Sequence, residues 1–302
     1  MTNRDTFIKK ISQIALEATL LEVSTHPKPG LVTPFSNGSH KDMSYVTFIK
    51  SASSIAPYFS EFINTGIIYS ENVLDKLRPI GLIAEKDMFY ATDGVNTHKG
   101  LIFLLGVICA GCGVLFREKK AVNRASISKI VSEITEGIVE RELNNYDEKK
   151  GMTNGQRIYK KYGLTGIRGE VEGGLKSIID YALPTFEKYN KRLSINDTLV
   201  NTLLSLMTVV DDTTVVHRTS IEGLNFVKKH SKIALELGGM ATKEGVDYIE
   251  NLDRKFKERN ISPGGCADLL AATYMIYKIE AIWRNEYADF TFINYQSQQE
   301  IY

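Results

Sequence analysis

Cationic, amide and hydroxyl side chains gather in one short stretch of this sequence, directly before its most apolar segment. The stretch "ATDGVNTHKG", residues 91–100, precedes the run "LIFLLGVICAGCGVLF". Thr97 is expected to cap the helix that begins near His98, and Asn96 to stabilise the turn before it. His98 and Lys99 would then lie in the first helical turn, where cations oppose the helix dipole unless a polyanion binds. The stretch predicts a phosphate site; the alternative is a capped helix whose cations face water.

A second polar stretch, "HPKPGLVTPFSNGSHKDM" over residues 26–43, is rich in groups that bind anions. Two prolines flank Lys28 and stiffen the chain, so its ammonium could be aimed at an anion. The alternative is a surface loop in which Asp42 or Ser44 caps the next helix. The side chains of this stretch that are candidates for ligand contact are Lys28, Asn37, His40, Lys41 and Asp42.

The third stretch, "YGLTGIRGE" over residues 162–170, places one arginine and one acid among glycines. The planar guanidinium of Arg168 suits a phosphate or a carboxylate. An internal ion pair between Arg168 and Glu170 within a glycine-rich turn is the equally weighted alternative.

A fourth stretch, "DDTTVVHR" over residues 211–218, joins two acids to two basic groups. The adjacent carboxylates of Asp211 and Asp212 suit Mg²⁺, which prefers oxygen ligands. His217 and Arg218 would face an anionic ligand. The alternative is that the two acids only mark the end of a helix.

A fifth stretch, "SPGGCADLL" over residues 262–270, is typical of a helix start. Asp268 falls in the first turns of that helix. Its carboxylate is interpreted as a helix cap or as a complement to the helix dipole.

Composition limits the class of protein. The chain has 302 residues, 43% of them apolar, and a formal net charge of +1, which argues against a broad nucleic-acid surface. The N-terminus lacks a secretory signal pattern, and the apolar run 101–116 is short for a bilayer, so a buried core helix and no membrane association are expected. The cysteines are Cys109, Cys112 and Cys266, an odd number that fits a reducing, cytoplasmic setting.

Two motifs that would suggest other chemistry are set aside. Cys109 and Cys112 form a C-x-x-C, but both lie inside the apolar run, where they are expected to be buried small hydrophobes rather than zinc or redox ligands. The sequence contains neither a G-x-x-x-x-G-K-[ST] nor a G-x-G-x-x-G motif. A bound nucleotide would therefore use neither a P-loop nor a Rossmann turn.

The hydrophobic period is helical almost throughout, and it predicts one all-α domain over residues 1–302, a multi-helix bundle with polar loops at its helix ends. Two helices are predicted around Phe7–Leu21 and Phe48–Ile63, the second kinked at Pro57 and ended by Gly66. "DFTFINY", 289–295, is read as a short strand or a tail. The remaining predicted helices span 80–92, 98–116, 125–144, 172–189, 195–210, 220–237, 242–259 and 265–286.

These residues predict a soluble helical enzyme whose ligand is a phosphorylated metabolite, with Mg²⁺ as cofactor. The five stretches, in this order, also resemble the triphosphoribosyl-dephospho-CoA synthases, from about residue 14 to about residue 280. That family serves the prosthetic group of citrate lyase and, in a sister branch, of malonate decarboxylase. The resemblance implies a helical fold, in agreement with the periodicity.

The sequence departs from the family pattern at a few positions. Thr33 stands where the family often has aspartate, and Thr214 where it often has asparagine. Thr219 and Ser220 replace a common glycine pair. Any metal or ribose contact made by those family residues is not carried over to this chain.

The resemblance implies that ATP gives its triphosphoribosyl group to the 2′-hydroxyl of 3′-dephospho-CoA and releases adenine. Displacement at an anomeric carbon has oxocarbenium-like character and needs a base for the attacking hydroxyl. Glu170 is the first candidate for that base and Asp42 the second, while His217 or His98 would protonate the leaving adenine. The implied substrate-binding residues are Lys28, Asn37, His40, Lys41, Asn96, Thr97, His98, Lys99, Arg168 and Arg218. The implied Mg²⁺ ligands are Asp211 and Asp212, with Glu85 in reserve.

The product is expected to pass to an acyl-carrier-protein transferase, and the oligomeric state is left open, a homo-oligomer included. One alternative is the same reaction in the malonate decarboxylase branch. A second is a Mg²⁺-dependent nucleotide or ADP-ribosyl hydrolase, and a third is a non-catalytic nucleotide-binding or CoA-binding protein. The products formed from ATP and 3′-dephospho-CoA would distinguish these classes.

Overall fold

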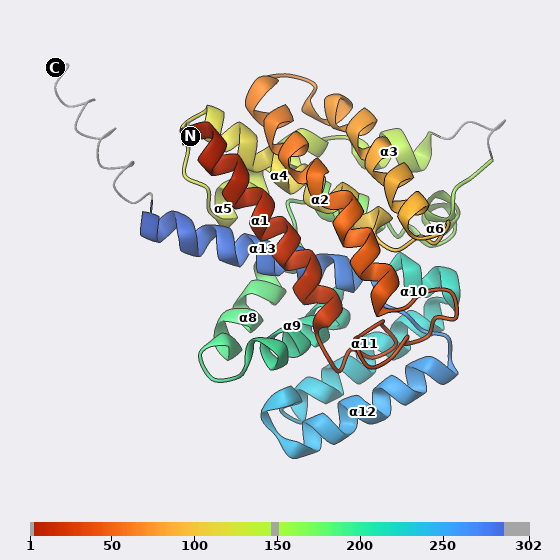
Figure 1. The fold of residues 1–302 in the computed structure, drawn as a ribbon. Coiled ribbons are helices and arrows are strands. Elements are labelled where there is room, and N and C mark those ends of the chain that lie inside the picture. The colour runs from red at the N-terminus through yellow and green to blue at the C-terminus, as the bar shows by residue number, and fades with distance from the viewer. Residues whose placement is uncertain (1–2, 146–150, 287–302) are drawn as a thin grey trace.

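Helices pack on one another around an apolar interior in the computed structural model, which describes residues 3–145 and 151–286 (Figure 1). No strand is formed in these residues beyond one isolated bridge, Thr33 to Ser36. The first half contains α1 (Asn3–Ser24), α2 (Tyr45–Ile68), α3 (Val73–Ala91), α4 (Lys99–Arg117), α5 (Arg124–Thr135) and the π-turn η1 (Glu140–Asn144). The second half contains α6 (Asn154–Tyr162), α7 (Gly166–Glu172), the π-turn η2 (Ile178–Ala182), α8 (Leu183–Asn190), α9 (Ile195–Val209), α10 (Thr213–Arg218), α11 (Ile221–Glu236), the 3₁₀ turn η3 (Gly239–Ala241), α12 (Lys243–Glu258) and α13 (Gly264–Glu286). The all-α prediction is confirmed.

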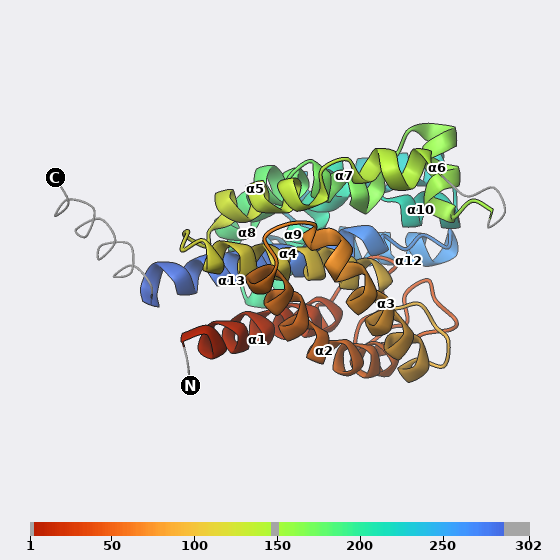
Figure 2. The ribbon, with the colours of Figure 1, turned by 90° about the horizontal axis from the view of Figure 1, so that it is seen from above.

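Helix α4 is the central element, as its apolar sequence predicts. From Leu101 to Leu115 nearly every side chain is buried. Seen from above, α4 lies with α13 between α1–α3 on one side and α5–α7 on the other (Figure 2). By length and hydropathy α4 could cross a membrane, yet 78% of its apolar window is buried inside the protein. Cys109 and Cys112 are buried within it, and burial raises the pKa of Cys112 to about 12, so neither is poised as a thiolate.

Glycines bring α2 and α4 unusually close. A Cβ at Gly66 would overlap the carbonyl oxygen of Ala110, and one at Gly113 would overlap that of Ile63. The prediction that Gly66 ends its helix is wrong, because α2 continues to Ile68. Gly66 instead lets two helix backbones touch, which anchors α4 and thereby the position of its first turn.

Three other predicted boundaries are wrong. The helix predicted over 80–92 begins at Val73. The helix predicted over 125–144 ends at Thr135, because Gly137 has a positive φ that breaks the run before η1. The helix predicted over 172–189 is broken where Leu175, next to a glycine, adopts a φ of +62°. Short helices α6 and α10 were not predicted, and 289–295 lies outside the described residues.

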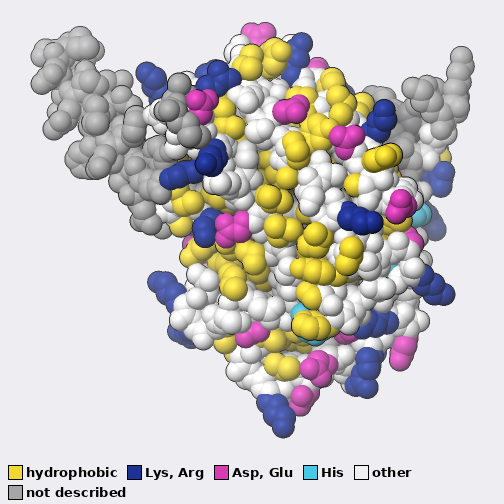
Figure 3. Space-filling model, in the orientation of Figure 1, with side chains coloured by type: hydrophobic (Ala, Val, Ile, Leu, Met, Phe, Trp, Pro, Cys, Tyr) yellow, Lys and Arg dark blue, Asp and Glu magenta, His cyan; other side chains and the backbone are white. Residues whose placement is uncertain are grey.

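Charges of both signs are interspersed over the face that carries α1 and α2 (Figure 3). No field of a single sign is visible on that face, in keeping with the formal net charge of +1. Positively charged side chains that bind an anionic ligand are therefore expected in local cavities rather than on this face.

Candidate active site

A cavity of about 180 Å³, here called the α4/α13 cavity, lies where the polar stretches of the sequence converge. It is bounded by the end of α1, the segment between α1 and α2, and the first turns of α4 and α13. Its polar lining side chains are Glu22, Lys28, His40, Asn96, Thr97, His98, Thr214, Ser262 and Asp268. Of the five stretches, all but residues 162–170 contribute to it.

The start of α4 is open toward this cavity. His98 occupies the N-cap position and its side chain makes no capping bond, while Asn96 Oδ1 accepts only a long bond of 3.4 Å from Lys99 N. The prediction that Thr97 caps α4 is wrong, because its hydroxyl donates instead to Ser51. The backbone N–H of His98 is bonded to Met88 Sδ, but the N–H of Gly100, which lines the cavity, has no side-chain cap and can meet an anion.

The start of α13 faces the same space. Gly264, its first residue, lines the α4/α13 cavity. A Cβ added at Gly264 would meet only Thr214, at an ordinary contact distance of 3.5 Å. Two long helices thus point their N-termini at one cavity, which favours a negatively charged ligand there.

A buried ion pair forms one wall of the cavity. Lys28 is only 2% exposed, and its Nζ donates to the carbonyl oxygen of Glu22 at 2.6 Å and to the Glu22 carboxylate. Burial lowers the pKa of Lys28, and the attraction of Glu22 opposes that shift. Glu22 was not among the predicted site residues. Its signal is its spacing: it lies four residues after Ala18 and eight after Ile14, on the apolar face of α1.

Asp268 is the carboxylate without a partner. It makes no hydrogen bond or ion pair with any described residue. Burial, together with repulsion from Glu22 and Asp212, raises its pKa well above the usual value. A Cβ at Gly100 would overlap its Oδ2, so a larger residue where α4 begins would displace the Asp268 carboxylate. A partly exposed carboxylate that no cation neutralises, on a cavity wall, is a candidate proton acceptor or cation ligand rather than a stabilising group.

His98 is held as a neutral hydrogen-bond donor. The Thr97 hydroxyl donates to Ser51 Oγ at 2.7 Å, and Ser51 Oγ lies 2.6 Å from His98 Nδ1. The Ser51 hydroxyl, which accepts from Thr97, has its own proton to donate to Nδ1, and in that tautomer the ring proton lies on Nε2. That Nε2 is buried without a partner, and burial beside Lys28 lowers the pKa of His98 to about 3. The sequence predicted that His98 is a cation; in the structure its imidazole is neutral and can donate a hydrogen bond.

His40 is also uncharged at neutral pH. Its Nε2 lies 2.8 Å from Ser262 Oγ, and its Nδ1 lies 3.8 Å from the exposed Asp42 carboxylate. Burial and the nearby Arg218 lower the pKa of His40 to about 4, against the attraction of Asp42. His40 can therefore bind a ligand by hydrogen bonding but not by charge.

Arg218 fastens the segment between α1 and α2 to the α12–α13 connection. Its guanidinium donates to the carbonyl oxygen of Ser39 at 2.7 Å and to the carbonyl and side chain of Asn260. Arg218 does not line the α4/α13 cavity, although it was predicted to bind phosphate. In this structure it positions the loop that carries Lys28 and His40.

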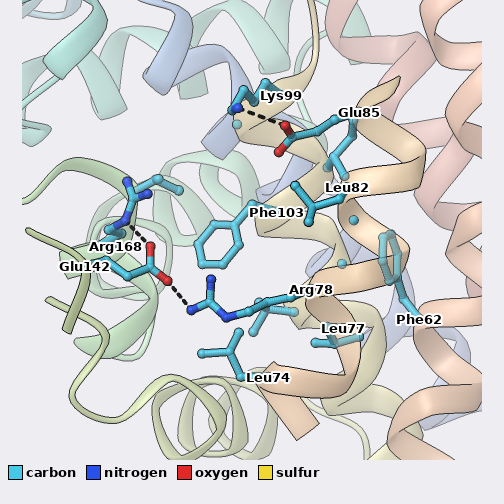
Figure 4. A pocket seen from close by; sticks show the side chains of 16 residues that line it. Phe62, Leu74, Leu77, Arg78, Leu82, Glu85, Lys99, Phe103, Glu142 and Arg168 are labelled. Atoms are coloured by element: carbon cyan, nitrogen blue, oxygen red, sulfur yellow. Dashed lines mark hydrogen bonds and ion pairs between the residues drawn. The ribbon is translucent and has the colours of Figure 1, made fainter. Parts of the chain in front are cut away.

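A second cavity of about 310 Å³, here called the α3/α4 cavity, holds other predicted residues (Figure 4). Glu142 lies between Arg78 and Arg168, which both donate to it, and Lys99 pairs with Glu85 at 2.8 Å. The alternative of an Arg168–Glu170 ion pair is wrong, since Arg168 pairs with Glu142. Gly100 lines both cavities, so the start of α4 separates them.

Several predicted residues line neither cavity. Glu170, the first candidate base, accepts bonds of 2.8 Å from the backbone N–H and the hydroxyl of Ser177, and burial raises its pKa. His217 is exposed and lies 3.0 Å from the Asn154 amide. The exposed members of the first loop that also lie outside both cavities are Asn37, Lys41 and Asp42.

The three predicted metal ligands do not come together. The exposed Asp211 pairs with Lys228 at 2.6 Å. The buried Asp212 caps α10 and also accepts from Cys266 N at 2.9 Å, which joins α10 to α13. Glu85 is taken by Lys99 in the α3/α4 cavity. Within residues 3–145 and 151–286 no group of three or more acidic, histidine or cysteine side chains could hold a metal ion.

Comparison with known proteins places this chain in a family. A family model described as "ATP:dephospho-CoA triphosphoribosyl transferase" matches residues 8–287. Relatives in two strains of Vibrio cholerae serotype O1, each named "Probable 2-(5''-triphosphoribosyl)-3'-dephosphocoenzyme-A synthase", are 40% identical over 91% of this chain and 89% of their own. A Haemophilus influenzae relative named "Protein CitXG" is 41% identical over 88% of this chain and 59% of its own. No solved structure matches significantly.

The family match and the Vibrio cholerae relatives each span most of the chain. The matched region includes every side chain that lines the two cavities. The chain therefore belongs to the triphosphoribosyl-dephospho-CoA synthase family of transferases.

Proposed function

We propose that this transferase moves the triphosphoribosyl group of ATP to the 2′-hydroxyl of 3′-dephospho-CoA, with release of adenine. The bond that breaks joins C1′ of the ribose to N9 of adenine, and no phosphoanhydride is cleaved. The triphosphate therefore has to be held rather than activated, which agrees with the lack of a P-loop motif in the sequence.

The observation that carries this proposal is the α4/α13 cavity. Two helix N-termini favour a polyanion, the charge of Lys28 is already matched by Glu22, and Asp268 lines the same cavity without a cationic partner. A site for a triphosphate next to a free carboxylate is the arrangement that a glycosyl transfer from ATP requires. The triphosphate would lie against the first turns of α4 and α13.

Asp268 is proposed as the general base. Its raised pKa lies in the direction that makes a carboxylate a stronger base, and no described residue competes for it. It would accept the proton of the attacking 2′-hydroxyl as the new C1′–O bond forms. The negative charge of Asp268 and Glu22 would also stabilise the positive charge that develops on the ribose.

His98 is proposed to assist the departure of adenine. Its Nε2–H has no partner in the protein and would donate to a ring nitrogen of the base as the C1′–N9 bond breaks. The exposed His217 lines neither cavity and is the weaker candidate for that role. Glu170 can act as the base only if its carboxylate gives up the hydrogen bonds that it accepts from Ser177.

Mg²⁺ is proposed as the ion that accompanies ATP. The α4/α13 cavity offers the carboxylates of Glu22 and Asp268, and Mg²⁺ bound to phosphates commonly takes one or two protein carboxylates. Glu22 would hold the ion with its second oxygen, which leaves Asp268 to accept the proton. The ion would supply charge neutralisation for the triphosphate.

The product is proposed to serve the citrate lyase prosthetic group, through an acyl-carrier-protein transferase, in the cytoplasm. This assignment follows from the resemblance of the five sequence stretches. The malonate decarboxylase branch would use the same chemistry and the same residues.

The test is to mix the protein with ATP, Mg²⁺ and 3′-dephospho-CoA and to follow the products by chromatography and mass spectrometry. Free adenine and a CoA derivative heavier by one triphosphoribosyl unit, in equal amounts, are expected. Adenine without the adduct would indicate a hydrolase that passes the ribosyl group to water. Formation of ADP or AMP, or no product, would contradict the proposed reaction.

A further inference from the structure

The α3/α4 cavity differs in chemistry from the cavity beside it. Apolar side chains make most of its wall, among them Leu77, Phe103 and Ile167. Its volume of about 310 Å³ falls in the range of small-ligand pockets. A wall of this kind suits an aliphatic or amphipathic group and offers little to a triphosphate.

The rim of this cavity is cationic on balance. It carries three cations, Arg78, Lys99 and Arg168, against two carboxylates, Glu85 and Glu142 (Figure 4). The cationic side chains are 33% to 54% exposed, so their ion pairs are solvated and can rearrange around an incoming anion. The rim therefore suits a phosphate group attached to whatever occupies the apolar wall.

The two cavities are neighbours through the start of α4. Gly100 lines both, and Lys99 in the α3/α4 cavity is adjacent in sequence to His98 in the other. The first turn of α4 therefore lies between the two cavities, and a ligand that occupied both would cross it beside Gly100. The acceptor 3′-dephospho-CoA has the matching order of groups: a ribose hydroxyl, then a diphosphate, then a long uncharged arm.

We propose that the α3/α4 cavity binds the pantetheine arm of 3′-dephospho-CoA, with the diphosphate against Lys99 and Arg168. This inference rests on the proposed function for the identity of the acceptor. It divides the substrates between the cavities, with the triphosphate of ATP on the α4/α13 side and the acceptor arm on the α3/α4 side.

Gly81 provides the means to test this division. It lines the α3/α4 cavity from α3, and a Cβ added there meets no atom within 4 Å. The Cβ of Gly81→Phe therefore meets no atom, the ring adds bulk at the cavity wall, and the helix propensity of the position improves. The matched control is Ile83→Phe, which introduces the same side chain at an exposed position of α3 that lines neither cavity.

The experiment is a calorimetric titration of wild type and both variants with 3′-dephospho-CoA, ATP and ADP, with thermal melting to confirm folding. ADP serves as the matched ligand because it has the nucleotide half of the acceptor without the arm. Gly81→Phe is expected to weaken binding of 3′-dephospho-CoA at least tenfold and to change binding of ATP and ADP less than twofold. Ile83→Phe is expected to change none of them.

Unchanged binding of 3′-dephospho-CoA to Gly81→Phe would overturn the inference and leave the proposed function standing. Weaker binding of ATP or ADP to that variant would also overturn it, because the cavity would then hold a nucleotide. If wild type binds 3′-dephospho-CoA as expected but releases no adenine from ATP, the proposed function fails while the arm site stands. Absence of any binding of 3′-dephospho-CoA to wild type would contradict both.

Discussion

The two cavities on either side of the start of α4 differ in how their charged side chains are paired and exposed to solvent. In the α4/α13 cavity the Lys28–Glu22 ion pair is buried, whereas Asp268 is partly exposed and has no partner that neutralises it. In the α3/α4 cavity partly exposed cations pair with carboxylates that are only 19% to 20% exposed, around an apolar wall. Half-exposed pairs contribute about 0–1 kcal/mol each and rearrange easily, which suits binding. A carboxylate with a raised pKa and no cationic partner contributes no ion-pair stability, so its place on the cavity wall indicates chemistry.

The largest effect is expected from Asp268→Asn. Loss of the proposed base should lower the transfer rate by about 10²–10⁴-fold. The same change should raise the free energy of unfolding by about 1 kcal/mol, because a desolvated charge is removed. The rate of adenine release measures the first effect, and urea denaturation measures the change in the free energy of unfolding. Asp247→Asn, at an exposed position of α12, is the control and should change neither. A rate within threefold of wild type would remove Asp268 from the mechanism.

Gly100→Ala should disturb both cavities at once. The added Cβ would overlap the Oδ2 of Asp268 and displace the carboxylate, so the transfer rate should fall about 10²-fold. Gly155→Ala is the control, since Gly155 lines neither cavity and its Cβ meets other atoms only at 3.8 Å or more. Steady-state kinetics at saturating substrates compare the two variants. Equal rates would show that the close approach of α4 to Asp268 is not required.

Lys28→Met tests the buried pair. The substitution leaves the Glu22 carboxylate buried and unmatched, which should lower the free energy of unfolding by about 3–5 kcal/mol. Lys28→Met with Glu22→Leu should recover most of that loss, because neither charge then remains. Urea denaturation of Lys28→Met, Glu22→Leu and the double variant gives the interaction free energy between Lys28 and Glu22. A single variant as stable as wild type would mean that Glu22 is solvated, in conflict with its burial.

The dependence of stability on pH tests the neutral histidines. The pKa of His40 is lowered to about 4 and that of His98 to about 3, so each binds fewer protons when folded than when unfolded. Stability from these groups is present above the unfolded pKa of about 6.5 and is lost as the pH falls from there toward 4. His98→Gln should reduce the slope in that window by up to about 1.4 kcal/mol per pH unit. An unchanged slope would show that His98 is accessible to protons in the folded state.

The smallest effect is expected in the α3/α4 cavity. Arg78→Gln removes a half-exposed partner of Glu142 and should change the free energy of unfolding by less than about 1 kcal/mol. Arg168 remains bonded to Glu142 and limits the loss. If urea denaturation showed that Arg78→Gln lowers the free energy of unfolding by several kcal/mol, the ion pairs of the α3/α4 cavity would not be solvated. The two cavities would then not differ in this respect.

The sequence predicted the helical class and the central buried helix, because apolar period and hydropathy report which residues face the interior. It also predicted a cluster of polar groups at the start of α4, because cations there conflict with the helix dipole. It could not show that α4 and α13 point at one cavity, since that depends on packing between segments far apart in the chain. The breaks at Gly137 and Leu175 depend on local positive φ values that periodicity does not register.

The roles of individual side chains were harder to predict from the sequence than the location of the site. Asp211 and Asp212 are adjacent in sequence, yet one faces solvent beside Lys228 and the other caps a buried helix start. Glu22 gave a readable signal as an acid on an apolar helix face. Asp268 was interpreted as a helix cap, because the sequence cannot show that the backbone N–H of Cys266 already bonds to Asp212.

The most direct measurement is a crystal structure of the protein with ATP and 3′-dephospho-CoA bound in the Asp268→Asn variant. The account predicts phosphate oxygens within hydrogen-bond distance of the first backbone N–H groups of α4. It also predicts the 2′-hydroxyl of the acceptor next to residue 268. A triphosphate bound elsewhere, for instance beside Glu170 and His217, would contradict the claim that the α4/α13 cavity is the catalytic site.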